Sequence, residues 1–185
     1  MVELVVKMGA SKLPERKVDK NVVSAQDIVR AAYELLGAPY RFWDPGDPIP
    51  LWRKDGKGDP PPARHLHNVG VSSADLVNYA LERNGLPPGG GTGTFGDYLV
   101  NTGNFDPSTP GQAGAVAVCP YSGPQLDQQG HVVLYLGGHQ VIHAIPPGQG
   151  GPSLGVTDQH TDEELYSWGL PYRFTVYGFL PGVSY

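Results

Sequence analysis

Three polar residues have side-chain types and a spacing that could support nucleophilic catalysis. Ser73 lies at the start of a predicted helix, where free backbone N–H groups and the helix dipole stabilise an anion. His131 and His143 lie 12 residues apart in two segments rich in Val and Ile. In nucleophilic catalysis a histidine accepts the proton of the nucleophile, and a second polar group orients that histidine. Either histidine alone would more often be structural, but together the three residues predict a catalytic site.

The relative orientation of the two histidines depends on the turn between their segments. If Gly137-Gly138 forms a two-residue hairpin turn, His143 lies opposite Val132, one position away from His131. Neighbours that are one residue out of register face opposite sides of a sheet. A β-bulge or a longer turn would instead place both imidazoles on one face. The spacing leaves both arrangements open.

The other histidines and the single cysteine are weaker candidates. His65 and His67 lie close together in a long loop, but no cysteines or carboxylates stand near them at ligand spacing. We therefore expect neither a metal nor another cofactor. Cys119 ends an apolar segment and is expected to be a buried core residue. His139 and His160 are expected on the surface.

The elements that must position these residues are two helices followed by several strands. The first helix begins with a capping-box pattern at Ser24 and ends at Gly37, and the second begins with the same pattern at Ser72 and ends at Gly85. A Pro- and Gly-rich loop over 38–70 separates them, and short helical segments are predicted at 94–101 and 161–168. Runs rich in Val and Ile predict strands at 115–119, 131–136, 140–145 and 174–180. This order predicts an α+β fold with helices packed on an antiparallel sheet.

Length and composition favour one domain and exclude some partners. The chain has 185 residues and a hydrophobic fraction of 39%, so a single domain over 1–185 is expected. It would comprise an N-terminal arm (1–22), a motif-bearing core (24–145) and a C-terminal loop, turn and last strand (146–185). The net charge of -5 argues against nucleic acid and anionic membranes as partners. Without a signal-like or membrane-spanning apolar stretch, we expect a soluble monomer.

Three motifs resemble those of the NlpC-type cell-wall cysteine peptidases. The stretch LGAPYRFW at 36–43 is similar to the family's Leu-Gly-x-Pro-Tyr-x-Trp motif. The stretch VSSADLV at 71–77 resembles its Asp-Cys-Ser-Gly-Leu-Val helix start. The stretches GHVVLYLG at 130–137 and IHA at 142–144 resemble its Gly-His-Val-x-(Ile/Leu)-Tyr-x-Gly and (Ile/Leu)-His-Ala motifs. The similarity spans about residues 24–145.

This resemblance implies a papain-like α+β fold and assigns roles to the candidate residues. It implies that His131 is the general base and that His143 is its orienting partner. It also implies that Tyr40 lines the site beside the nucleophile. Trp43 lies in the same Pro-rich loop and is expected to form part of the substrate wall, and Ser72 is expected to contact the substrate as well.

The chain departs from the family pattern at the nucleophile. Ser72, Ser73 and Ala74 stand where the family has Asp, Cys and Ser. A serine hydroxyl is far less acidic than a thiol, so a helix terminus alone does not activate it. We therefore expect a domain that is inactive or nearly so with Ser73. A cysteine replaced to inactivate the enzyme would explain this residue, and so would a natural variant.

The resemblance implies a peptidoglycan stem-peptide hydrolase that cleaves a D-glutamyl–diamino acid bond through an acyl-enzyme on residue 73. The expected partner is the peptidoglycan stem peptide, reached on the bacterial wall. The missing secretion signal suits a phage lysin released through host lysis or a tail-associated enzyme carried on a virion. Two alternatives stay open: a naturally inactive peptidoglycan-binding module, and a papain-like amidase or transferase.

Overall fold

The computed structural model describes residues 22–41, 60–90, 111–119, 130–146, 155–167 and 174–185, and within these ranges it is an α+β structure. The helices are α1 (Ala25–Tyr33), α3 (Ala63–Val69), α4 (Ser73–Arg83) and α6 (Asp162–Ser167). The strands are β1 (Val23–Ser24), β2 (Val116–Cys119), β3 (His131–Gly137), β4 (Gln140–Ile145), β5 (Gly155–Thr161), β6 (Val176–Gly178) and β7 (Val183–Ser184).

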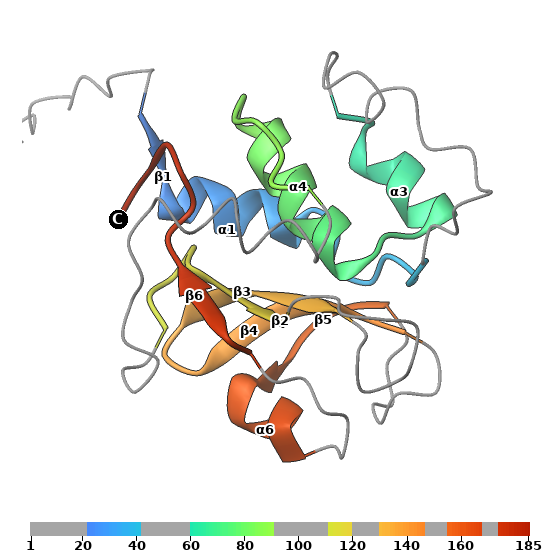
Figure 1. The fold of residues 1–185 in the computed structure, drawn as a ribbon. Helices are drawn as coiled ribbons and strands as arrows, with labels where there is room; N and C mark the ends of the chain where they lie inside the picture. The colour runs from blue at the N-terminus through green and yellow to red at the C-terminus, as the bar shows by residue number, and fades with distance from the viewer. Residues whose placement is uncertain (1–21, 42–59, 91–110, 120–129, 147–154, 168–173) are drawn as a thin grey trace, which may run out of the picture.

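The five longer strands form one antiparallel sheet in the order β5-β4-β3-β2-β6. The short strands β1 and β7 pair in parallel and form a separate two-stranded sheet. Helices α1 and α4 lie on one face of the five-stranded sheet, and α6 lies on the other (Figure 1). The predicted arrangement of helices packed on an antiparallel sheet is therefore confirmed.

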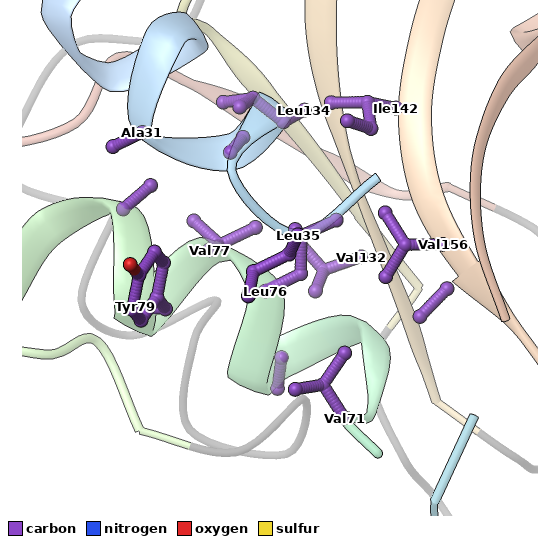
Figure 2. Packing of buried hydrophobic residues seen from close by; sticks show 14 of the residues in the cluster. Ala31, Leu35, Val71, Leu76, Val77, Tyr79, Val132, Leu134, Ile142 and Val156 are labelled. Carbon is purple, nitrogen blue, oxygen red and sulfur yellow. The ribbon is translucent and has the colours of Figure 1, made fainter. Parts of the chain in front are cut away.

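The two faces of the sheet carry two apolar clusters, because strand residues alternate between faces. Figure 2 shows the larger cluster, in which Leu35, just after α1, and Leu76 of α4 pack near Val132 and Leu134 of β3. The second cluster lies on the α6 face and contains the alternate residues of β3, Val133 and Tyr135. Residues from α6 and from the segment before β6 also belong to it; its members include Val133, Tyr135, Val141, Leu165 and Phe174. This alternation decides which face each histidine occupies.

Helices α1 and α4 begin where the capping patterns predict. The Ser24 side chain accepts a hydrogen bond from the Asp27 backbone N–H at 3.2 Å, and Asp27 accepts one from the Ser24 N–H at 3.1 Å. At α4 the reciprocal bonds between Ser72 and Asp75 measure 2.9 and 3.2 Å. Each box satisfies two backbone donors that the helix itself leaves unpaired.

Four elements were not predicted: helix α3, strand β5 and the two-residue strands β1 and β7. Helix α3 lies inside the region predicted as loop. It follows a Pro-rich segment and buries one apolar side chain, Leu66, which is 3% exposed, so it shows no helical apolar pattern. Strand β5 has only Val156 as a large apolar residue, so its Val/Ile content gives no strand signal. The predicted helical turn after it is present as α6, whereas the predicted helix at 94–101 lies outside the described residues. No helix within the described ranges is long and apolar enough to cross a membrane.

Candidate functional site

The site is built around two buried histidines from neighbouring strands. His131 Nε2 lies 3.0 Å from His143 Nδ1, a hydrogen-bond distance. The rings meet edge to face, with centroids 5.2 Å apart and planes at 80°. Their residues are only 2% and 1% exposed. The structure therefore brings the predicted His–His pair together.

A β-bulge in β3 produces this pairing. At the turn Gly137 pairs with Gln140, but the next pairs are Tyr135 with Val141 and then Leu134 with Ile142. The pairing of Gly137 with Gln140 places the turn at 138–139, one residue later than predicted, and the extra residue in β3 then shifts the register back by one. As a result His143 lies opposite Val133 rather than Val132. Because residues two apart share a face, His131, Val133 and His143 all point the same way. The second of the two arrangements left open by the sequence is the one adopted.

A third histidine joins the pair, and its predicted surface position is wrong. His160 of β5 is only 8% exposed, and its Nδ1 lies 3.2 Å from His143 Nε2. The rings of His143 and His160 are again edge to face, with centroids 5.4 Å apart. The described residues thus contain a continuous chain, His131–His143–His160, which we call the histidine chain. His160 could have been found from the sequence only if β5 had been predicted as a strand, and the polar sequence of β5 gives no strand pattern.

Burial keeps the histidine chain neutral at pH 7. It lowers the pKa of His131 to about 3. The pKa of His143 lies well below the usual value because of burial and because His131 and His160 flank it. Burial also lowers the pKa of His160, and the Glu164 carboxylate partly opposes that effect. Each ring therefore carries one N–H and one bare nitrogen, so each can donate one hydrogen bond and accept one.

Ser73 is the first residue of α4 and is 5% exposed. Within the described residues no hydrogen bond joins it to His131 or His143. Helix α4 packs on the Val132 face of β3, whereas His131 lies on the other face, with its ring centroid 6.3 Å from that of Phe174. His131 is, however, the first residue of its strand. A contact between residue 73 and His131 therefore has to pass around the end of β3, and this pairing stays a prediction.

Cys119 is buried as predicted, at 7% exposure, but its neighbour across the sheet is unexpected. It pairs directly with His131 in the β2–β3 ladder. The Cβ atoms of such pairs lie about 4.5–5.5 Å apart. The only thiol of the chain is therefore close to the candidate base, and any thiol chemistry assigned to residue 73 must be measured with Cys119 removed.

Tyr40 lies beside the start of α4. It forms a parallel bridge with Val71, and the Arg41 N–H donates to the Val71 carbonyl at 3.1 Å. Burial and the nearby Asp75 carboxylate raise the pKa of Tyr40 to about 12, so its hydroxyl stays protonated. The structure thus places Tyr40 near the first turn that contains Ser73.

Ser72 and Trp43 are the other two residues predicted to contact the substrate. The Ser72 hydroxyl caps α4 by accepting from the Asp75 N–H. Trp43 lies outside the described residues.

No other feature of the described residues competes with this site for catalysis. No three His, Cys, Asp or Glu side chains in those ranges converge as metal ligands. His67 instead lies with Nε2 2.9 Å from the Glu34 carbonyl oxygen. A pocket of about 520 Å³ opens on the helical side, and no histidine lines it; its walls are Glu34, Pro60, Pro61, Pro62, Ala63, Tyr79, Glu82, Arg83 and Gly85.

Comparison with protein-family models finds no match to this chain, and comparison with curated proteins finds none either.

Proposed function

We propose that this chain is a papain-like cysteine-peptidase scaffold that recognises peptidoglycan stem peptides, with Ser73 at the position of the nucleophile. The observation that carries the proposal is the buried contact of 3.0 Å between His131 and His143. Two neutral imidazoles in this arrangement are suited to proton transfer, because one can accept a proton while the other fixes its orientation. The resemblance of the flanking motifs to the NlpC-type peptidases supports the substrate class.

The chemistry would require a thiol at residue 73. A thiolate there would attack the peptide carbonyl carbon, and N–H groups at the start of α4 would hold the oxyanion. His131 would carry the proton from the thiol to the leaving amine, and water would then hydrolyse the acyl-enzyme. The helix terminus contributes only about 0.3–1 kcal/mol toward an anion. That effect helps a thiol with a free pKa of about 8.5 but leaves a serine hydroxyl protonated.

The low pKa of His131 is a second reason why the hydroxyl of Ser73 stays protonated. A base with a pKa of about 3 accepts a proton from a serine hydroxyl only at great energetic cost. With Ser73 the domain is therefore inactive or nearly so toward the D-glutamyl–diamino acid bond. Its site of action is the bacterial cell wall, as a phage lysin or a virion-borne enzyme would require.

The direct test replaces Ser73 by cysteine in a chain that lacks its native thiol. Cys119→Ala is the parent, and Ser73→Cys is added to it. We expect the rate of hydrolysis of purified stem peptides to rise at least on the order of a hundredfold, the effect of restoring one catalytic group. Adding His131→Ala should abolish the gain, because the thiol then lacks its base. Product peptides are quantified by chromatography and mass spectrometry, which also identify the bond cleaved.

A second function is favoured by the serine itself, because a cleft with no competent nucleophile can still hold its ligand. In that case the chain is a peptidoglycan-binding module. Binding of the stem peptide that is equal in the parent and in Ser73→Cys, without hydrolysis by either, would establish this function and exclude the peptidase. Transfer of the acyl group to an added amine instead of water would identify an amidase- or transferase-type enzyme.

A further inference from the structure

The histidine chain extends one residue beyond the pair that the proposed mechanism uses. We propose that His160 is a positioning residue that sets the tautomer of His131 through His143. The inference deepens the proposed function, since the tautomer of His131 decides whether it can act as a base toward residue 73. The tautomer of His131 can also be measured in a chain that does not catalyse hydrolysis.

Both ring nitrogens of His143 face another histidine. Its Nδ1 faces His131 Nε2 at 3.0 Å, and its Nε2 faces His160 Nδ1 at 3.2 Å. A neutral imidazole has one donor and one acceptor nitrogen. When His143 accepts at Nδ1, it must therefore donate at Nε2, and the reverse holds as well. The direction of one hydrogen bond fixes the direction of the other.

Only one of the two directions leaves His131 able to accept a proton at Nδ1. If His160 accepts at Nδ1, then His143 donates to it from Nε2 and accepts from His131 at Nδ1. His131 then carries its proton on Nε2 and has a bare Nδ1. In the opposite direction His131 carries its proton on Nδ1 and cannot serve as a base there. His160 must therefore accept at Nδ1 and carry its own proton on Nε2.

Glu164 of α6 favours that state of His160. Its carboxylate lies close enough to raise the pKa of His160 against the effect of burial. When Nδ1 of His160 accepts from His143, the proton of His160 is on Nε2, and the negative charge of Glu164 stabilises positive charge on the ring. Glu164 is itself anchored, since its Oε2 accepts from the Thr161 N–H at 2.8 Å and its N–H donates to Thr161 Oγ1 at 3.2 Å. His143 from β4 and Glu164 from α6 are thus both among the groups that act on His160.

The position of His160 results from a second bulge, between β4 and β5. His143 pairs with Thr157 and Val141 pairs with His160, so three residue steps on β5 span two steps on β4. In a regular strand His160 would face the side opposite to Thr157. The bulge turns it to the face of His143, which is a common use of bulges near functional sites.

The first experiment reads the tautomers by long-range ¹H–¹⁵N NMR of the imidazole rings at pH 7. In the parent chain we expect His131 with its proton on Nε2 and a bare Nδ1. In His160→Ala, His131 should become a mixture of both tautomers, whereas His160→Gln, whose amide oxygen can accept, should restore the parent state. Glu164→Gln should also give a mixture, and it tests the idea even if His160→Ala does not fold. His139→Ala is the matched control, because His139 bonds Asp162 rather than the histidine chain.

A second arm uses the Ser73→Cys, Cys119→Ala chain. There His160→Ala should lower kcat on the order of tenfold without changing KM, and His160→Gln should recover it, as expected of a group that orients a histidine. A His131 tautomer that is unchanged in both His160→Ala and Glu164→Gln would overturn the inference even if hydrolysis is present. A tautomer that changes as predicted in a chain without hydrolysis would support the inference while the proposed function fails.

Discussion

At the scale of single residues, burial decides what the candidate site can do. His131 and His143 are among the least exposed polar residues that the structure describes, and burial holds both in the neutral form. Neutral rings can relay a proton through hydrogen bonds without the cost of a buried charge. The same burial makes His131 a weak base, which cannot deprotonate a serine hydroxyl. The residue at position 73 therefore determines whether the scaffold turns over substrate.

The buried histidines also predict how stability depends on pH. The folded-state pKa of His131, about 3, lies below its usual value of 6.5, so the unfolded chain binds a proton that the folded chain does not. The contribution of His131 to the free energy of unfolding is therefore fully present above about pH 6.5. It falls by about 1.4 kcal/mol per pH unit as the pH drops toward 3. His131→Gln should flatten the slope by that amount between pH 6 and 4. The slope is measured by urea unfolding at several pH values.

His65→Gln on the exposed face of α3 is the control for the same substitution at another histidine. Equal slopes for the parent and His131→Gln would show that His131 titrates in the folded chain as it does in the unfolded chain. That result would contradict the buried, neutral state assigned to it.

At the scale of elements, small departures from regular structure bring the site residues together. One bulge in β3 puts His143 on the face of His131, and another in β5 adds His160. On the helical side Gly70, with φ of 89°, lets residues 39–41 approach the start of α4. A Cβ at Gly70 would lie 2.8 Å from Arg41 Cβ and 2.9 Å from the Pro39 carbonyl oxygen. Tyr40 reaches α4 only because this space is empty.

Gly70 and Gly37 form a matched pair for testing this close approach. Gly37 has φ of 82°, but a Cβ there would meet nothing within 4 Å. Gly37→Ala should therefore cost only the strain of the left-handed backbone, about 1–2 kcal/mol. Gly70→Ala should cost more, because the backbone must also move away from Pro39. Unfolding free energies of the two variants measure the difference, and equal losses would mean that Tyr40 is not held against α4 by this contact.

The sequence predicted the parts of the fold that depend on local patterns and missed those that depend on one-residue shifts. The caps at Ser24 and Ser72 were predictable because a capping box involves only four successive residues. The common face of His131 and His143 was not predictable, because no change in the pattern of apolar residues along β3 indicates the bulge at Leu136. His160 was missed because a strand as polar as β5 shows no hydrophobic period.

At the scale of the whole molecule, the candidate site joins two layers. Residue 73 belongs to a helix that covers one face of the sheet, and the histidine chain lies on the other face. The two can meet only around the first residue of β3. Catalysis at this site therefore requires residue 73 and His131 to lie close together around the end of β3.

The most direct test is the pKa of a thiol placed at residue 73. In the Ser73→Cys, Cys119→Ala chain, the pH dependence of the reaction with iodoacetamide gives this pKa. We predict a value below the usual 8.5, because the start of α4 stabilises the thiolate, and a change in that value when His131→Ala removes the ring beside the thiol. Ser73→Ala in the Cys119→Ala chain shows the background labelling. A thiol pKa at or above 8.5 that is the same with and without His131 would contradict the account.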